Sequence, residues 1–201
     1  MWGDGSAIAI CPMSADAYPY DFRGIVQHEA GGHGFAKLGD EYIYHNAFIS
    51  ACPSEGDVSI VVSAAHNLGW YINLALTGNV DEVVWSHLIF NPKYSNIVDI
   101  YEGGYMHSRG VFRSEPNSCM NNNIPYYSAI SRQEMVERIK RYAGEEFSLD
   151  EFYANDVLDM QGNITGSTRA EVETPLIFSG AGKQMPPKFM GNKPQLKKSN
   201  K

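Results

Sequence analysis

The sequence predicts a single domain of the α+β class, with some α/β-like character. Three observations favour this class: a helical pattern near the N-terminus, an alternating apolar segment at residues 97–113, and two helix-start signals in the C-terminal half. The chain has 201 residues, of which 43% are hydrophobic and 19% are charged. This length and composition are typical of one globular domain with its own hydrophobic core.

The net charge and the composition of the chain argue against several classes of binding partner and of protein. The formal net charge of −7 argues against nucleic acid and against an anionic membrane surface as the main partner. No apolar run approaches transmembrane length, and the N-terminus carries no basic-then-apolar leader. The three cysteines, Cys11, Cys52 and Cys119, are too few for a disulfide scaffold and form no CxxC pair.

The N-terminal third predicts a strand followed by a helix. Residues 6–10 are expected to form a short buried strand that Cys11-Pro12 ends. Asp21 is the expected N-cap of a helix that runs to about Lys37, with Gly39 as its terminator. The residues at helical spacing that we expect to face the core are Phe22, Ile25 and Val26.

The middle of the chain gives weaker signals. Residues 59–63 favour a strand, and a short helix is expected around Trp85. Residues 97–113 alternate and contain three glycines, which predicts a β-hairpin or two short strands. Residues 114–123 predict a tight polar turn around Met120.

Two capping boxes mark helices nearer the C-terminus. Ser131 to Glu134 opens a helix that ends at Ala143-Gly144, and Ser148 to Glu151 opens a short helix to about Leu158. Residues 186–201 are basic and proline-rich, which predicts a disordered tail.

The hexapeptide His28-Glu29-Ala30-Gly31-Gly32-His33 is the main functional signal. Zinc binds neutral imidazole nitrogens and carboxylates, and a hydrolytic zinc site also needs a free carboxylate as base. The usual zinc-peptidase motif has its histidines at i and i+4, whereas here they are at i and i+5. In a regular α-helix such positions lie about 140° apart, so the pair can share one ion only if a π-bulge intervenes. Gly31 and Gly32 tolerate such a distortion best.

The residues therefore predict zinc ligation by His28 and His33, with Glu29 as the general base. The third ligand is Asp40 or Glu41, which follow one short loop later. The alternative interpretation is a helix with two unrelated surface histidines. The remaining histidines, at 45, 66, 87 and 107, are expected to have ordinary partners.

Other polar residues near these motifs have weaker claims to a chemical role. Tyr126 and Tyr127 could supply a phenol to a developing oxyanion, with an ordinary structural role as the alternative. Glu102 and Arg113 favour a structural charge pair. Ser118 and Cys119 lack an evident histidine base, which disfavours nucleophilic catalysis.

Several segments together resemble the IgA-peptidase-type zinc metallopeptidases, a metzincin-like family. The matching segments are His28-Glu29…His33…Asp40-Glu41-Tyr42, Tyr101-Glu102-Gly103-Gly104, Gly110-Val111-Phe112-Arg113 and Asn117-Ser118-Cys119-Met120. The segments occur in this order, and the resemblance as a whole covers roughly residues 3–143. The hexapeptide alone also resembles the HExxxH pattern of dipeptidyl-peptidase III type exopeptidases.

The resemblance implies a metzincin-like zincin fold for residues 1–185. It implies zinc held by His28, His33 and Asp40, with Met120 as a Met-turn beneath the imidazoles. Such a fold places sheet strands before the histidine-bearing helix, but only about 20 residues precede it here. Either this chain is the catalytic part of a longer protein, or the earlier strands come from elsewhere.

The function expected from the resemblance is a zinc-dependent metalloendopeptidase. It would hydrolyse protein or glycoprotein substrates and be secreted or located in the bacterial cell envelope. The alternative is a non-catalytic binding or structural module on a zincin-like scaffold. An exopeptidase is a third possibility.

Overall fold

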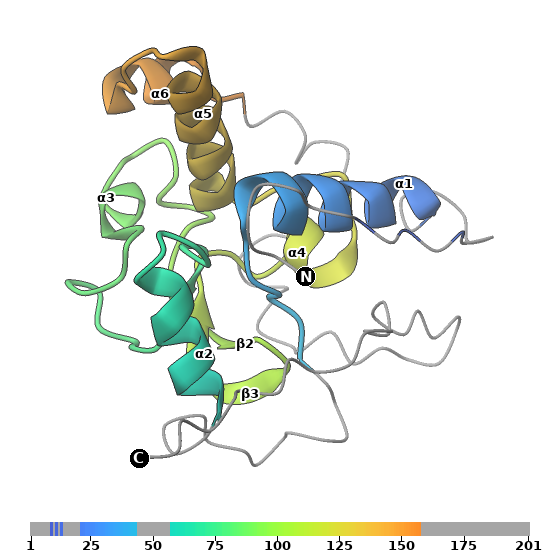
Figure 1. Cartoon of the computed structure of the whole chain (residues 1–201). Coiled ribbons are helices and arrows are strands. Elements are labelled where there is room, and N and C mark those ends of the chain that lie inside the picture. The colour runs from blue at the N-terminus through green and yellow to red at the C-terminus, as the bar shows by residue number, and fades with distance from the viewer. Residues whose placement is uncertain (1–8, 10, 12, 14–20, 44–56, 158–201) are drawn as a thin grey trace, which may run out of the picture.

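The computed structural model of the chain describes residues 9, 11, 13, 21–43 and 57–157, which Figure 1 shows in colour. These residues form helices and one three-stranded antiparallel sheet, which confirms the α+β class. The predicted strand at residues 6–10, apart from Ala9, and the predicted tail at residues 186–201 lie outside the described residues. No helix within the described ranges is both long enough and apolar enough to cross a membrane.

The first helix starts as predicted but packs differently. In α1 (Phe22–Val26), the N-cap Asp21 accepts a hydrogen bond of 3.0 Å from the backbone N–H of Arg23. Ile25 is buried, but Phe22 and Val26 are 39% and 40% exposed, so the expectation that all three face the core was wrong. The packed face is centred on Gly24 and Ile25, because a Cβ on Gly24 would lie 1.9 Å from the carbonyl oxygen of Asn123.

The helix continues without a break as the π-helix η1 (Gln27–Ala36), visible in Figure 1 as one blue rod. It ends at Lys37, which takes a left-handed conformation (φ 57°) and donates its N–H to the carbonyl of Gly32. Gly39 is therefore not the terminator that the sequence predicted. A Cβ on Gly39 would lie 2.5 Å from Leu74 Cδ1, so a glycine is needed there for close packing.

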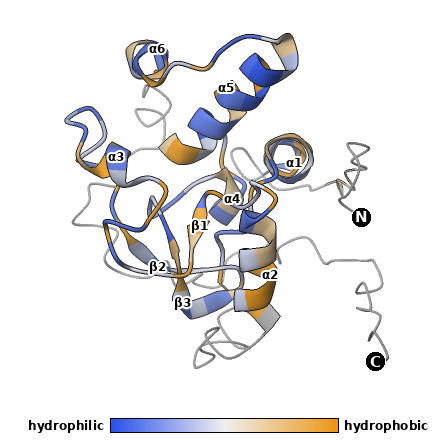
Figure 2. Ribbon diagram, turned by 60° about the vertical axis from the view of Figure 1, so that its left-hand side comes forward, coloured by the Kyte–Doolittle hydropathy of each residue, from blue (hydrophilic) through white to orange (hydrophobic). Residues whose placement is uncertain are grey.

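The predicted strand at residues 59–63 is wrong, because this segment belongs to the helix α2 (Asp57–His66). Its apolar residues follow helical spacing: Val62 and Ala65 are buried, whereas Ile60 is 64% exposed. The helix lies beside the sheet in Figures 1 and 2, and His66 Nε2 hydrogen-bonds the carbonyl of Leu74 at 3.1 Å.

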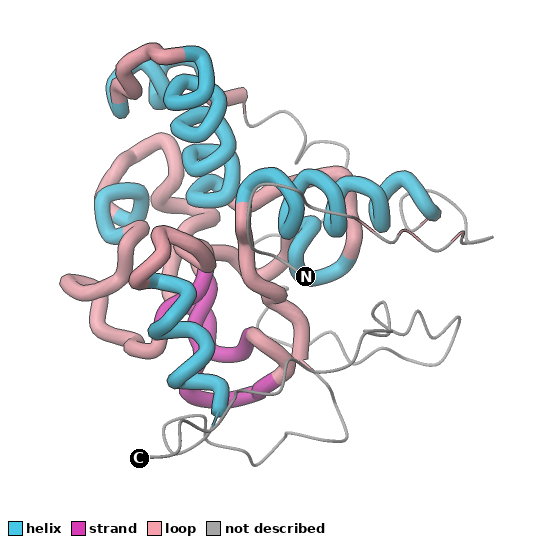
Figure 3. Tube along the Cα trace, in the orientation of Figure 1, coloured by secondary structure: helices cyan, strands magenta, loops and turns pink. Residues whose placement is uncertain are grey.

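The sheet has the strand order β1-β3-β2 and follows η1 in the chain. Strands β2 (Tyr101–Gly104) and β3 (His107–Arg113) form the predicted hairpin, and β1 (Leu74–Ala75) pairs with the end of β3. The short helix α3 (Ser86–Ile89) confirms the helix expected around Trp85. In Figure 3 the strands lie on one side of the molecule and α5 and α6 on the other.

Three further helices complete the described fold. The polar turn around Met120 contains a one-turn helix, α4 (Cys119–Asn122), with Ser118 as its N-cap. Helix α5 (Ala129–Ala143) begins earlier than predicted, with Ser128 in place of Ser131 as N-cap, and ends at Gly144 as expected. Ser131 instead pairs with Ser128, and Glu134 pairs with Arg138 at 2.5 Å. Ser148 caps α6 (Leu149–Asn155) as predicted, although α6 ends before Leu158.

The hydrophobic core divides into two clusters. The larger joins β1, α3, α5 and α6, with Trp85, Leu88, Tyr94 and Ile130 at its centre. The smaller lies against η1 and contains Ala36, Leu38 and Met120. The second cluster supports the segment that carries both histidines of the hexapeptide.

Candidate metal centre

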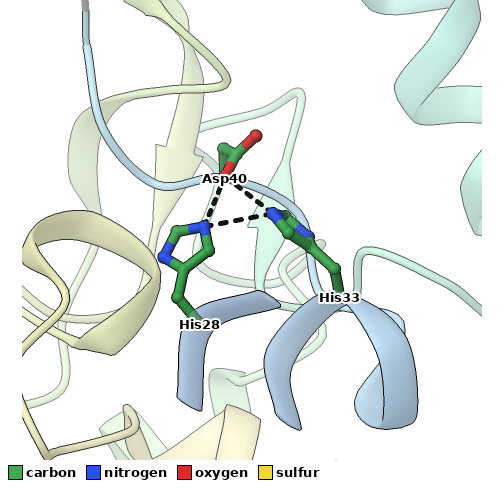
Figure 4. Close-up of side chains that lie close together, drawn as sticks. All are labelled: His28, His33 and Asp40. Atoms are coloured by element: carbon green, nitrogen blue, oxygen red, sulfur yellow. Dashed lines mark hydrogen bonds and ion pairs between the residues drawn. The ribbon is translucent and has the colours of Figure 1, made fainter. Parts of the chain in front are cut away.

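Three side chains from one short segment converge on a single point. His28 and His33 project from successive turns of η1, and Asp40 faces them from the following loop (Figure 4). Oδ1 of Asp40 lies 2.9 Å from His28 Nε2 and 3.0 Å from His33 Nε2, and the two Nε2 atoms are 3.1 Å apart. This group is able to hold a metal ion.

The other nitrogen of each imidazole fixes the tautomer. His28 Nδ1 lies 2.9 Å from the carbonyl oxygen of Cys119, and His33 Nδ1 lies 2.8 Å from that of Leu38. A carbonyl oxygen can only accept, so each Nδ1 carries the hydrogen and each neutral ring presents its Nε2 lone pair to Asp40. Three acceptor atoms therefore face one another, an arrangement that needs a proton or a cation between them.

The distances fit a small tetrahedral cation. Bonds of about 2.0–2.1 Å to zinc place neighbouring ligand atoms roughly 3.3 Å apart, so the three atoms need to separate by only a few tenths of an ångström. Two imidazoles and one carboxylate leave a fourth position for water or substrate, as in catalytic zinc sites.

The short distances between Asp40 and the two imidazoles shift the pKa values of His33 and Asp40. Burial by itself lowers the pKa of His33, but the Asp40 carboxylate outweighs burial and raises this pKa to about 9. Burial by itself raises the pKa of Asp40, but the two imidazoles outweigh it and hold this pKa well below its usual range. Without a metal, the group thus retains a proton that a cation displaces on binding.

The π-helix brings the two histidines together. Its hydrogen bonds join residues i and i+5, so His28 and His33 stand one turn apart on the same face. The predicted irregularity at Gly31-Gly32 is confirmed, but it extends over ten residues and is not a single bulge. The hydroxyl of Tyr127 supports this geometry, since it donates to the carbonyl of Gln27 at 2.5 Å.

Met120 packs against Gly32 of the histidine-bearing helix, whereas its expected place beneath the two imidazoles stays a prediction. It is fully buried, and a Cβ on Gly32 would lie 2.2 Å from its sulfur atom. Its neighbour Cys119 supplies the carbonyl that orients His28. Helix α4 therefore supports η1 at both histidines, through Cys119 at His28 and through Met120 next to His33, although it lies far from them in sequence.

Gly32→Ala is expected to destabilise the protein, because the added methyl group overlaps the sulfur of Met120. Overpacking of this kind typically costs about 1–3 kcal/mol. The free energy of unfolding from urea titration measures this loss. The same substitution in a Met120→Ala background should cost less, because the clashing atom is gone. Equal losses in both backgrounds would show that the methyl group acts elsewhere.

The carboxylates of Asp40 and Glu41 point to different partners. Glu41 is buried and accepts hydrogen bonds from Asn73 at 2.8 Å and from Ser118 at 2.5 Å. Burial raises the pKa of Glu41, and these two hydrogen bonds oppose that rise. Asn73 also binds both the N–H and the carbonyl of Gly39 at 2.8 Å, so it holds the residues on either side of Asp40. No sequence pattern singled out Asn73, which appears there only as a lone amide between Ile72 and Leu74.

Glu29 lies next to His28 on η1 and is half-buried. Burial raises the pKa of its carboxyl group, and the nearby His33 and His28 oppose the rise. No hydrogen bond to Glu29 is found within the described ranges. Its carboxylate is thus near the group of three but does not join it.

Other residues that the sequence singled out have structural partners. His66 and His87 bond the carbonyl of Tyr71 and the side chain of Gln133, as expected, whereas His45 lies outside the described residues. Arg113 donates to the backbone carbonyls of Glu102 and Gly103, so the expected charge pair with the Glu102 carboxylate was wrong. The Glu102 carboxylate instead accepts a hydrogen bond from the N–H of Gly110.

The two tyrosines suggested as phenol donors are engaged elsewhere. Tyr126 donates to the buried Glu115 at 2.7 Å, and Tyr127 donates to the carbonyl of Gln27. Two other tyrosines that contact the Asp40 loop were missed: the N–H of Tyr105 donates to the carbonyl of Asp40 at 2.8 Å, and Cγ of Tyr71 would lie 3.1 Å from a Cβ on Gly39. They come from segments far from the hexapeptide, so no local pattern connects them with it.

No protein-family model matches this chain, and no curated protein matches it.

Proposed function

We propose that this chain is a zinc-dependent metalloendopeptidase. The observation that carries the proposal is the convergence of His28 Nε2, His33 Nε2 and Asp40 Oδ1, with both imidazole tautomers fixed by backbone carbonyls. A set of two histidines and one carboxylate is typical of catalytic zinc sites. Zinc held there would polarise a carbonyl group and lower the pKa of a bound water.

The protein's own residues supply the proton transfers. Glu29 takes a proton from the attacking water as the new C–O bond forms, and it passes that proton to the leaving nitrogen as the C–N bond breaks. Its position beside the group of three, but outside it, suits a base that must not become a ligand. The products are a carboxylic acid and an amine.

The presence of Glu29 helps to decide between zinc and ferrous iron as the metal. Two histidines and one carboxylate also bind ferrous iron in oxygen-using enzymes. A general base next to the first histidine serves hydrolysis, which favours zinc. The resemblance to IgA-peptidase-type enzymes supports the same choice. On that resemblance we extend the proposal to a metzincin-like fold, protein or glycoprotein substrates, and a secreted or cell-envelope location.

Metal removal and return test the proposal directly. The zinc-loaded chain should contain one zinc ion per molecule by elemental analysis and should cleave an unfolded protein at internal bonds. A chelator should abolish cleavage, and zinc, but not ferrous iron, should restore it. Mass spectrometry of the products measures which bonds are cut.

Each alternative gives a different result. Stoichiometric zinc without cleavage of any protein or peptide would support the binding module. Stepwise loss of one or two residues from a chain end would support an exopeptidase. A chain that binds no zinc would contradict the proposed function itself.

A further inference from the structure

The histidine-bearing helix changes its hydrogen-bond register at Gln27. The N–H of Gln27 donates to the carbonyls of Arg23 and Gly24, four and three residues before it, as in the last turn of an α-helix. The π-helix η1 begins at this same residue. His28 and His33 share one face because positions i and i+5 lie one turn apart in η1. The metal centre therefore depends on what enforces the change of register at Gln27.

The local sequence of η1 does not enforce this register. Its ten residues include three glycines, at positions 31, 32 and 34. Glycine lowers the intrinsic stability of a helix, and π-helical geometry is usually limited to a single turn. A π-helix of this length and composition thus needs contacts from elsewhere in the chain.

Tyr127 makes such a contact at the residue where the register changes. Its hydroxyl donates to the carbonyl of Gln27 at 2.5 Å. A Cβ on Gly31 would lie 2.4 Å from the hydroxyl oxygen, so the hydroxyl occupies the space that a side chain would fill. In a regular α-helix the carbonyl of Gln27 would accept the N–H of Gly31. Tyr127 thus contacts both residues that an α-helical hydrogen bond would join, and a side chain inserted at such a bond distorts the helix.

Tyr127 is held in place by α5 and α6. Its ring packs against the smaller core cluster, and its carbonyl accepts a hydrogen bond from Nη1 of Arg132 on α5. Nε and Nη2 of Arg132 in turn bind the two carboxylate oxygens of Asp156, the C-cap of α6, each at 2.7 Å. The position of the phenol is therefore set by elements that hold no ligand of the metal centre.

We propose that Tyr127 is a positioning residue, whose hydroxyl holds η1 in the register that the metal centre requires. This inference rests on the metal centre of the proposed function and does not depend on peptide cleavage. The hydroxyl engages the carbonyl of Gln27 and keeps it from closing an α-helical bond with Gly31. In the α-helical register the side chains of His28 and His33 would point about 140° apart and could not share one ion.

The test compares Tyr127→Phe with the wild-type chain in two measurements of metal binding. Phenylalanine keeps the ring in the core cluster and removes only the hydroxyl. Competition with a chromophoric chelator measures the affinity for zinc. Cobalt(II), bound in place of zinc, gives a visible absorption spectrum that changes with the number and geometry of its ligands.

Tyr127→Phe should lower the affinity for zinc by about 10–100-fold, the loss typical of residues that orient a ligand without binding the metal. Its cobalt spectrum should lose the intense bands of a four-coordinate site. Tyr142→Phe is the matched control, because Tyr142 also lies against η1, with its ring centroid 6.2 Å from that of Phe35, and is 73% exposed. This control should match the wild-type chain in both measurements.

Gly31→Ala tests the position of the hydroxyl. The added methyl group overlaps the hydroxyl oxygen of Tyr127, so this variant alone should also lower the affinity for zinc. In the Tyr127→Phe background the methyl group fills the space that the hydroxyl has left. The double variant should therefore lose less affinity than the product of the two single losses. Losses that simply multiply would show that the two residues act on the metal centre independently, which contradicts the proposal.

Two further results would overturn the inference. One is a wild-type zinc affinity and cobalt spectrum in Tyr127→Phe. The other is an equal loss of affinity in Val62→Ala, which removes buried methyl groups from α2 and lowers the urea midpoint of unfolding by general destabilisation. A wild-type chain that binds zinc without cleaving peptides would refute the peptidase function and leave this inference standing, whereas a chain that binds neither metal would refute both.

Discussion

Glu29→Gln is expected to leave zinc bound and to lower peptide-bond cleavage by at least about 10²–10⁴-fold, the usual contribution of a positioned base. Glutamine has nearly the size of glutamate but cannot accept the proton of the attacking water. The Glu29 side chain lies outside the group of donor atoms, so zinc affinity should not change. Elemental analysis and kcat on one peptide measure the two effects separately.

Glu146→Gln is the matched control for this variant. Glu146 is exposed near the end of α5, so its replacement should change neither zinc content nor kcat. Cleavage at the wild-type rate by zinc-loaded Glu29→Gln would refute the assignment of Glu29 as base, and another acceptor near the metal would then be required.

His33→Ala is expected to abolish zinc binding and cleavage together. Two remaining protein donors seldom hold zinc at a catalytic site built for three. The loss of zinc affinity should exceed the roughly 10–100-fold typical of residues that only support a ligand. Competition with a chromophoric chelator measures this affinity. His87→Ala is the control, because His87 bonds Gln133 and is not part of the group of three.

The same assay separates Asp40 from Glu41. Asp40→Ala should behave like His33→Ala, because Oδ1 of Asp40 contacts both imidazoles. Glu41→Gln should retain zinc with weaker affinity, since its carboxylate only braces the loop through Asn73 and Ser118. If Glu41→Gln lost zinc and Asp40→Ala kept it, the roles assigned to these two carboxylates would have to be exchanged.

Predictions from local sequence succeeded where the physics is local. Asp21 and Ser148 cap their helices because a side-chain oxygen needs only the amide two or three residues ahead. The spacing of His28 and His33 predicted a helical irregularity because an ion shared across five residues requires one.

Predictions failed where distant packing decides the outcome. Residues 60–62 are β-branched and apolar but belong to a helix, because Val62 and Ala65 meet the core at helical spacing. A glycine at position 39 is typical of a helix terminator. In the structure, however, the close packing of Tyr71 and Leu74 leaves no room for a side chain there. The supports of the metal centre, Asn73 and Cys119, come from other parts of the chain, and no pattern around residue 28 reveals them.

The short separation of the three donors determines how a bound ion stabilises the fold. The donors are separated by only 5 and 7 residues along the chain, so the ion closes small loops and removes little entropy from the unfolded chain. Its stabilising effect comes from binding to the folded state and grows with the concentration of free metal ion. The hydrogen bond from His28 Nδ1 to the carbonyl of Cys119, 91 residues away, links the ligand segment to α4, so we expect metal occupancy to stabilise a segment that holds no ligand.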